Sequence, residues 1–398
     1  MATINKIIYR TFQFSLFLLV CYGAHAWFTW DYDFLDYREL IPYFLLFSII
    51  TLIYQVRFDI KLKNPFLLFL IYLSLTIALS FPVFGYSVPI ISFFWLYPMF
   101  VLLNDKRHIQ GHLNFLTKLL CGIIIPGIII WGILFFYPFP GYPIQWGDLS
   151  VNESYFFLNY VFCLKDLYYA DSIRFQSVFL EPSYFGTLLA FLLYANKFSI
   201  NKVTIKILLI GVILSFSLAA WIITLLGYVL YRIDSGFNIK WISTFCVFIV
   251  FLYAFALNYN DGNNAINELI VQRLELDNSG GIEGNNRFTQ DTDIMYDNYA
   301  QNSDLLWGHR NIEIKSSAGY KVYFIQHGVV SAFFCLTLYL LIVIYSKSRR
   351  YGFFFILLLV ITFLQAAYPF SLAWIIPFVL GVSNYKQMTH KCKAYLDL

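Results

Sequence analysis

The stretch TIKILLIGVILSFSLAAWIITLLGYVLYR, residues 204–232, decides the fold of this chain. It is apolar along almost its whole length, and it permits either one long tilted helix or two short helices that meet near Ser215 and Ser217. One helix would cross a bilayer once, whereas two helices would cross it twice. The choice between them therefore decides on which side of a membrane every later loop lies.

The composition of the chain is that of a membrane protein. Among its 398 residues, 60% are hydrophobic and 13% are charged, and the mean hydropathy is +0.66. Soluble domains carry about 25% charged residues, because their surface must face water. Apolar runs recur along the chain, each near the roughly 20 residues that cross about 30 Å of hydrocarbon. Since these runs do not alternate in polarity as barrel strands do, we predict an all-α polytopic membrane protein.

Hydropathy predicts about 12 transmembrane helices within a single membrane domain that covers residues 1–398. The predicted ranges are 11–30, 39–56, 65–84, 86–103, 115–138, 178–195, 204–217, 218–232, 240–257, 319–345, 351–367 and 369–384. This count takes 204–232 as two helices, and the distribution of charge supports that choice.

Basic residues gather in alternate loops when 204–232 is divided. With two helices, 19 of the 27 Lys and Arg residues lie on one side, together with only four of the 23 Asp and Glu residues. Loops rich in Lys and Arg stay in the cytoplasm, so both termini are expected there. A single helix would place Arg232 and Lys240 outside and would invert every later loop, so two helices are favoured.

Two loops on the predicted outer side, 139–177 and 258–318, are far longer than the others. Loops of this length are uncommon unless they carry function or are disordered. We therefore expect the functional site to face outward, among the charged residues of these two loops.

The first long loop ends in Arg174-Phe-Gln-Ser-Val-Phe-Leu-Glu181-Pro182-Ser183. Arg174 and Glu181 are seven residues apart, which on a helix places them on one face. Glu181 would then lie at or just inside the bilayer, where a carboxylate is costly unless paired or hydrated, and Pro182 would expose carbonyls there. The pair either fixes a helix end or belongs to a polar site at the mouth of a membrane cavity. The second interpretation is favoured, because intramembrane carboxylates are rarely retained for stability alone.

The second long loop and the start of the span after it hold further polar residues. Arginine grips phosphate oxygens through two hydrogen bonds and stays charged at a membrane surface. The residues of interest for binding are Arg273, Arg287, Arg310, Tyr320 and Lys321. His309 lies in a predicted turn and His327 lies about two turns into the predicted span 319–345, and each is either a functional base or an ordinary hydrogen-bonded histidine.

No metal site or cofactor site is predicted. The six cysteines stand singly, and none forms the pairs typical of zinc sites. Asp291-Thr-Asp293 resembles the DxD metal motif of nucleotide-sugar enzymes, but such short patterns occur by chance in an acidic loop. No Walker A, HExxH or GxSxG context appears, so we expect no metal, no cofactor and no nucleic-acid partner.

Four short segments follow one another between about residues 174 and 335. They are Arg174 to Ser183, Leu214 to Trp221, Arg287 followed by Leu305-Leu-Trp-Gly308, and Tyr320 to Val330 with His327-Gly328 at its centre. In this order they resemble the Wzy-type O-antigen or capsule repeat-unit polymerases of the O-antigen ligase/polymerase superfamily. Two features depart from the family pattern. Leu218 and Ala219 stand where many relatives have Ser-Arg, and no histidine stands near Ser316, where the ligase branch has one. The second departure favours a polymerase over a ligase.

The resemblance implies a metal-independent glycosyltransferase with a GT-C-like fold in the bacterial cytoplasmic (inner) membrane. Its substrates would be undecaprenyl-diphosphate-linked oligosaccharides at the outer leaflet, and a flippase and a chain-length regulator would be possible partners. Arg174 and Arg287 would bind diphosphate, with Arg273 and Arg310 as second choices. Glu181 would orient or activate the acceptor hydroxyl, and a histidine is the alternative base.

Two other functions stay open. An O-antigen ligase of the same superfamily would transfer finished polymer to a lipid A core. A lipid-linked oligosaccharide flippase or a solute transporter belongs to a different class, and such proteins often contain internal repeats of helix groups. We find no convincing repeat, and large polar outer loops are atypical of carriers. The sugars and the linkage formed are not readable from the sequence.

Overall fold

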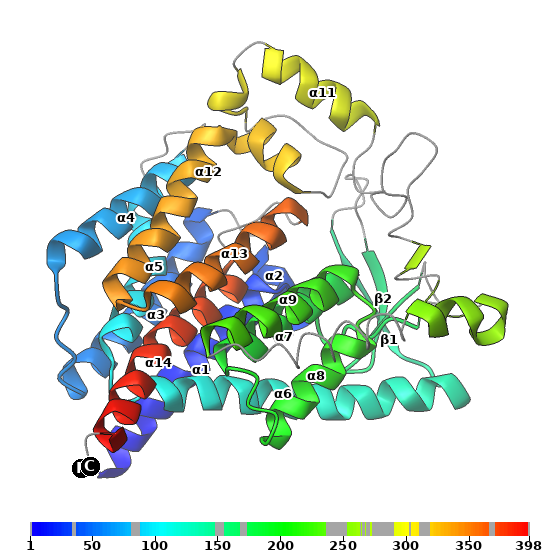
Figure 1. Cartoon of the computed structure of the whole chain (residues 1–398), viewed down its shortest axis with the longest axis horizontal. Helices are drawn as coiled ribbons and strands as arrows, with labels where there is room; N and C mark the ends of the chain where they lie inside the picture. Colours follow the sequence, from blue (N-terminus) through cyan, green and yellow to red (C-terminus); the bar gives the residue numbers. More distant parts are fainter. Residues whose placement is uncertain are drawn as a thin grey trace. The chain divides into compact units, whose positions relative to one another are not determined.

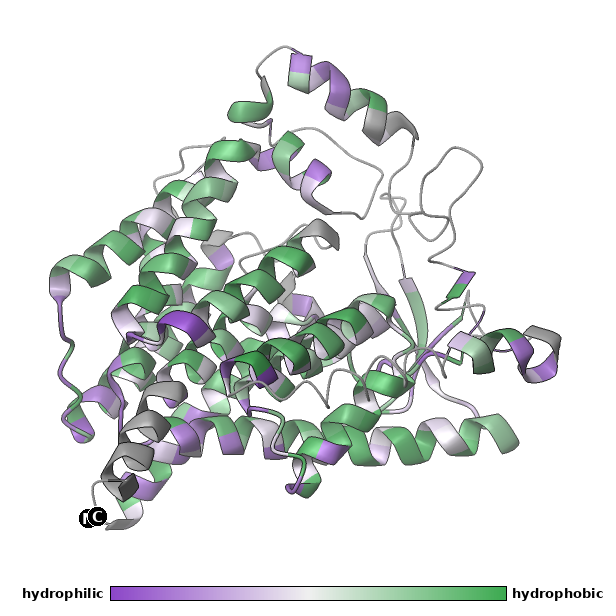
Figure 2. Ribbon diagram, viewed as in Figure 1, coloured by the Kyte–Doolittle hydropathy of each residue, from purple (hydrophilic) through white to green (hydrophobic). Residues whose placement is uncertain are grey.

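The computed structural model describes residues 2–33, 37–80, 88–147, 155–167, 173–235 and 253–262, short pieces at 264, 267 and 271–272, and then 290–301, 304–309, 319–365 and 371–396. Most of these residues are helical (Figure 1). Figure 2 shows that hydrophobic residues cover most of the helical ribbon. The described chain divides into two compact units, Met1–Leu120 with Gln290–Leu398, and Cys121–Thr289, and the boundary falls within helix α6 (Ile109–Phe136). Each unit is described by itself.

The first unit contains helices at both ends of the chain. Besides the first part of α6, they are α1 (Ala2–Gly23), α2 (Trp30–Asp33), α3 (Tyr37–Arg57), α4 (Pro65–Ser80), α5 (Val88–Asn104), α11 (Gln290–Gln301), α12 (Gly319–Ser346), α13 (Arg349–Gln365) and α14 (Leu372–Leu396), with the 3-10 helices η1 (Trp27–Thr29) and η5 (Asp304–Leu306). The second unit contains the rest of α6, α7 (Pro182–Ala195), α8 (Val203–Leu214), α9 (Leu218–Asp234) and η2 (Tyr259–Gly262), with strands β1 (Tyr142–Trp146), β2 (Tyr155–Asn159) and β3 (Leu164–Asp166).

Most described helices follow the predicted ranges, and the decisive stretch does form two helices. The predicted ranges 115–138 and 369–384 are too short, because α6 begins at Ile109 and α14 continues to Leu396. α8 and α9 flank a turn at 215–217, and Ser217 caps α9 by accepting a hydrogen bond from the Ala220 amide. The predicted helix 11–30 is wrong at both ends, because α1 begins at Ala2 and ends at Gly23. The helix α1 ends because His25 adopts the left-handed conformation, with φ 53°. The Ala26 amide then donates a hydrogen bond to the Cys21 carbonyl. The predicted helix 240–257 lies mostly outside the described residues.

Among the described helices, four are long and apolar enough to cross a membrane: Thr3–Gly23, Glu39–Arg57, Ile109–Phe136 and Gly319–Ser346. Shorter apolar helices accompany them, including α7 and α8. Large apolar side chains on α3 are exposed, among them Leu46 and Ile53. A surface of this kind fits a lipid environment better than water, so the chain has the helical architecture of a membrane protein.

Loops that the sequence predicts on one side of the membrane lie together in the first unit. The Tyr345 hydroxyl, near the end of α12, is 2.7 Å from the Lys63 carbonyl and 2.7 Å from the Asn104 side-chain oxygen. The Arg57 guanidinium donates to the Asn5 side chain near the N-terminus. These contacts join the chain start, the α3–α4 loop and the ends of α5 and α12, as the predicted alternation requires.

A buried polar cluster stabilises the loop between α5 and α6. The Asp105 carboxylate accepts from the Tyr54 hydroxyl at 2.5 Å, and it is 3.0 Å from ring nitrogens of both His108 and His112. Phe12 of α1 stacks on Tyr54 with ring centroids 4.1 Å apart. Burial raises the pKa of Asp105, but hydrogen bonds from His112 and Tyr54 and the charge of the histidines outweigh it and hold that pKa at about 2.

The second unit is built around α7, whose side chains are all buried from Phe185 to Ala195. Its glycine, Gly186, lies directly against the α8–α9 turn: a Cβ there would be 2.6 Å from the Ala220 Cβ and 2.7 Å from the Ser215 Oγ. Within the first long loop, β1, β2 and β3 form an antiparallel sheet in that order, with Ile144 opposite Phe157. The sequence analysis did not predict this sheet, although its aromatic-rich strands suit a pleated, half-buried surface.

Gly186→Ala is expected to lower the thermal unfolding temperature of the purified chain in detergent. The added methyl group would overlap Ala220 and Ser215, and overpacking of this kind costs about 1–3 kcal/mol. Gly132→Ala on α6 is the matched control, because no atom lies within 4 Å of a Cβ at that position. Equal unfolding temperatures for the two variants would show that α7 does not approach the turn this closely.

Acid is expected to destabilise the first unit through Asp105. Because its pKa in the folded protein is about 2, below the ordinary 3.8, its stabilisation is present above about pH 4 and is lost as the pH falls toward 2. The effect is roughly 2 kcal/mol. Asp105→Asn should therefore unfold at lower temperature at pH 7 and should show a flatter dependence between pH 4 and pH 2. Asp59→Asn, at an exposed loop position, should match the wild type.

Candidate functional site

The segment from Arg174 to Glu181 is not helical, which corrects the prediction that these residues share a helix face. α7 begins only at Pro182, and Glu181 adopts an extended conformation with φ −135° and ψ 147°. The proline ring disfavours the α conformation in the residue before it. Proline at the first helical position therefore starts the helix and prevents its extension backwards.

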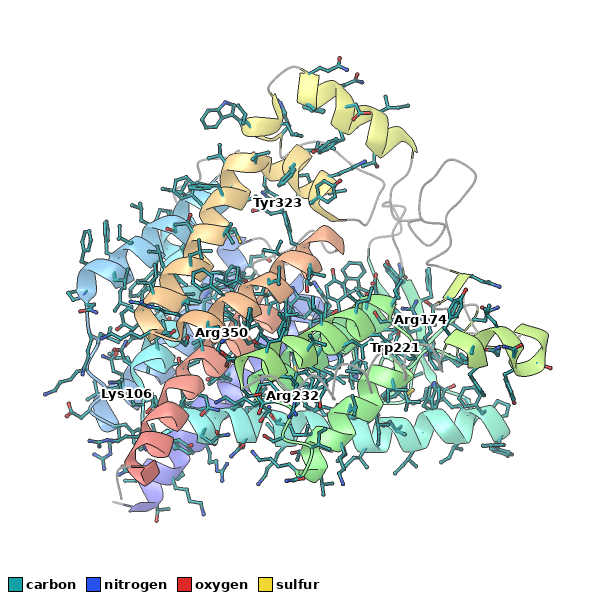
Figure 3. All side chains as sticks on the ribbon, in the orientation of Figure 1. Lys106, Arg174, Trp221, Arg232, Tyr323 and Arg350 are labelled. Atoms are coloured by element: carbon teal, nitrogen blue, oxygen red, sulfur yellow. The ribbon has the colours of Figure 1, made fainter. Side chains whose placement is uncertain are left out.

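Backbone hydrogen bonds attach this segment to the α8–α9 turn and to the sheet. The Phe175 amide donates to the Leu214 carbonyl at 2.9 Å, and the Arg174 Nε donates to the Ser215 carbonyl at 3.4 Å. The Leu164 amide of β3 donates to the Ser177 carbonyl at 2.8 Å. Two segments that resemble the polymerase family, 174–183 and 214–221, thus meet in one unit, where Figure 3 marks Arg174 and Trp221.

The Glu181 carboxylate is held by two hydroxyl groups at the start of α7. Tyr155 donates to Oε1 at 3.1 Å, and Ser183 donates to Oε2 at 2.7 Å. Glu181 occupies the N-cap position, where the helix dipole favours negative charge, but its side chain makes no capping hydrogen bond. A carboxylate accepts about four hydrogen bonds, so this one keeps lone pairs with which it could take a proton from a substrate hydroxyl.

In the first unit, α12 is broken at Gly328. This glycine has φ 81° and ψ 160°, a combination essentially restricted to glycine. Gly308, with φ 74°, lies against the break: a Cβ there would be 2.5 Å from the His327 carbonyl carbon, and one on Gly328 would be 2.5 Å from the Leu306 carbonyl oxygen. The His309 amide donates to the Ile325 carbonyl at 2.6 Å, so the loop satisfies a carbonyl near the break.

Aromatic side chains lie near the break, and a lysine lies at the start of the same helix. The His309 ring lies 5.0 Å from the Tyr299 ring, and the His327 ring lies 4.7 Å from the ring of Tyr323, marked in Figure 3. At the start of α12, the Lys321 ammonium lies 5.4 Å from the ring centroid of Tyr296 in a cation–π contact. The accessible rings among them, together with the Lys321 ammonium, are of the kinds that contact sugars and anions.

The predicted site residues fall into three groups. Arg174 and Glu181 lie in one segment of the second unit. His309, His327, Tyr320 and Lys321 lie in the first unit, near the broken part of α12. The remaining three, Arg273, Arg287 and Arg310, lie outside the described residues.

Several residues of these clusters escaped prediction. Tyr155, which binds Glu181, comes from a strand 26 residues earlier, and no sequence pattern connects the two. Gln176 lies within the segment 174–183 and is not among the predicted site residues. It is only 5% exposed, and its Nε2 has no hydrogen-bond partner among the described residues. A glycine in the middle of a predicted helix, here Gly328, is the sequence feature that could have indicated the break in α12. Within the described residues, no group of three His, Cys, Asp or Glu could hold a metal ion.

Comparison with known proteins does not add a relative. The chain matches no family model, no curated protein and no solved structure.

Gly328→Ala is expected to destabilise the chain and loosen the Leu306–His309 segment. Alanine tolerates the backbone conformation of Gly328 poorly, at a cost of about 1–3 kcal/mol, and its methyl group would overlap the Leu306 carbonyl. Amide hydrogen exchange of the peptide over 304–309 should become faster than in the wild type. Unchanged exchange would contradict the close contact, and Gly132→Ala again supplies the control.

Proposed function

We propose that this chain polymerises undecaprenyl-diphosphate-linked oligosaccharide repeat units into O-antigen or capsular polysaccharide. The reaction would take place at the outer leaflet of the bacterial inner membrane, with both termini in the cytoplasm. The observation that carries the proposal is the Glu181 carboxylate, held by Tyr155 and Ser183 at the start of α7 and joined to Arg174 through one short segment. The helical, apolar architecture is compatible with lipid-linked substrates.

The reaction moves the growing glycan from its lipid carrier to a new repeat unit. An acceptor hydroxyl oxygen attacks the anomeric carbon, and the bond between that carbon and the diphosphate oxygen breaks. The electron pair leaves with the lipid diphosphate, and Glu181 takes the hydroxyl proton as general base. Glu181 suits this role because Tyr155 and Ser183 fix the position of its two oxygens without charge.

Developing negative charge on the diphosphate requires nearby positive groups. Arg174 is the described arginine of this segment, and its Nε donates to the Ser215 carbonyl at 3.4 Å, which places its charge beside the α8–α9 turn. Arg287, then Arg273 and Arg310, are the further proposed diphosphate ligands. In the first unit, Tyr320 and Lys321 are proposed to bind substrate as well.

Either histidine near the α12 break is an alternative base. His309 is exposed and His327 is half-buried, so both rings are within reach of solvent. Individual His309→Ala and His327→Ala variants test this choice. Loss of polymer in one of them, with polymer retained in Glu181→Gln, would transfer the role of base to that histidine.

Reconstitution separates the polymerase from its rivals. Purified chain in liposomes receives lipid-linked repeat units, and the length of the glycan is followed by gel electrophoresis. Chain growth supports a polymerase, whereas movement of the units across the bilayer without growth indicates a flippase. A ligase would leave the units unjoined but would transfer a supplied polymer to a lipid A core. A chain-length regulator and a flippase are the proposed protein partners.

Glu181→Gln is expected to lower the polymerisation rate by roughly 10²–10⁴, because it removes the base and keeps the size of the side chain. Arg174→Ala should cost about 10²–10³ through lost charge stabilisation. Arg174→Lys should fall between Arg174→Ala and the wild type, since it keeps the charge without the planar fork. Wild-type polymer ladders from both Glu181→Gln and Arg174→Ala, at matched protein levels, would overturn the assignment.

A further inference from the structure

Helix α12 gives a scale for depth in the first unit, because its second end lies among basic residues. The Tyr345 hydroxyl lies 2.7 Å from the Lys63 carbonyl. Three exposed basic residues follow Tyr345 in the chain, Lys347, Arg349 and Arg350. Charged side chains are costly inside the hydrocarbon of a bilayer. Tyr345 therefore marks one boundary of the apolar part of α12.

The neighbouring helix α4 gives the same scale independently. The Ser331 Oγ of α12 donates to the Ala78 carbonyl of α4 at 2.7 Å. Ser331 lies 14 residues before Tyr345, which corresponds to about 21 Å of helix. Ala78 lies 13 residues after Pro65, which corresponds to about 20 Å. The two helices therefore rise together from the same boundary.

The break in α12 lies near the other boundary of a bilayer. Gly328 lies 17 residues before Tyr345, or about 26 Å, and a hydrocarbon core is about 30 Å thick. The charged, amide and imidazole side chains of α12 all come before the break, at Lys321, Gln326 and His327. Figure 1 shows that α12 changes direction after its first turns. The apolar part of the helix thus ends about where the hydrocarbon would end.

The turn that follows η5 is held at the depth of this break. A Cβ on Gly328 would be 2.6 Å from the Trp307 carbonyl carbon. The His309 amide donates to the Ile325 carbonyl at 2.6 Å. Because both contacts fix the backbone of the turn to α12, Trp307 lies at the level of the break.

Two large apolar side chains project from this turn. Leu306 is 46% exposed and Trp307 is 56% exposed. Tryptophan is enriched where lipid chains meet headgroups, because its ring is apolar and its N–H is polar. At about 26 Å from the opposite boundary, exposed side chains of this kind contact lipid rather than water.

We propose that Leu306 and Trp307 form a lipid anchor, which inserts at the headgroup boundary of the bilayer and fixes η5 to the membrane surface. The partner is the bilayer itself, so the anchor does not depend on the proposed reaction. α11 carries three aspartates and ends shortly before η5. The anchor therefore also keeps this polar helix near the lipid headgroups.

The depth of Trp307 is measured by fluorescence of the full chain in phosphatidylcholine vesicles. Its signal is the difference between the wild type and Trp307→Phe, because the other tryptophans are common to both. Should Trp307→Phe fail to fold, Trp307→Tyr takes its place. Lipids brominated on the acyl chain close to the headgroup are compared with lipids brominated at the chain end, and iodide in the buffer reports contact with water.

A deep reference combines Trp307→Phe with Phe333→Trp. Phe333 is 63% exposed and lies 12 residues before Tyr345, about 18 Å from that boundary and so near the middle of the bilayer. The Phe333→Trp signal should be quenched more by bromine at the chain end. The Trp307 signal should show the reverse order, with stronger quenching by bromine close to the headgroup.

Three other results would overturn the anchor. Quenching of the Trp307 signal by iodide and by neither lipid would place the ring in water. Quenching by none of the three would place it against protein, such as a second copy of the chain. A profile equal to that of the Phe333→Trp reference would place the break in the middle of the bilayer.

The anchoring effect is tested by amide hydrogen exchange in the same vesicles. Trp307→Ser removes the apolar ring, so exchange over 304–309 should become several-fold faster than in the wild type. Trp307→Phe keeps an apolar ring and should stay close to the wild type. Unchanged exchange in Trp307→Ser would show that the ring does not hold η5 at the membrane, and the anchor would be wrong.

Discussion

A backbone polar group that is buried away from water needs a hydrogen-bond partner within the protein, and both clusters of this protein depend on that constraint. Where the chain leaves a helix, another segment must supply the missing partner. Near the break in α12, the His309 amide satisfies the Ile325 carbonyl. Ahead of α7, the Phe175 amide bonds to the Leu214 carbonyl at the tip of the α8–α9 pair. Each of these hydrogen bonds brings polar side chains from distant parts of the sequence to one place.

Hydrogen bonds of this kind require that two backbone segments approach each other closely, and glycine permits the close approach at both places. Gly186 lets α7 touch the turn that carries Ser215, where any Cβ would overlap Ala220. Gly308 and Gly328 contact each other through their bare backbones, and both have positive φ. The polar clusters are therefore consequences of helix packing as much as of their own side chains, so a steric change at a glycine should disturb them from a distance.

Hydropathy and charge predicted much of the helical framework, including the division of 204–232, because both depend on the average character of a segment. They missed what single residues determine. The chain reversal at His25 ends α1 early, and Pro182 keeps Arg174 and Glu181 off a shared helix face. They also missed the contact of Tyr155 with Glu181, since a pairing across 26 residues of loop leaves no periodic signal. Hydropathy and charge describe each segment by itself, whereas the residues of a site are brought together from distant segments by tertiary packing.

The environment of Glu181 differs from that of an ordinary N-cap residue. An N-cap side chain ordinarily bonds to amides of the first helical turn. Pro182 has no amide hydrogen to offer, and the Glu181 side chain makes no capping bond to the others. Its oxygens are bound instead by hydroxyl groups, one from its own helix and one from the sheet. Glu181 thus occupies the cap position without the usual capping bond, and its carboxylate stays oriented by uncharged donors. Under the proposed function, a carboxylate held in this way would accept the proton of the acceptor hydroxyl, while its negative charge still suits the N-terminus of α7.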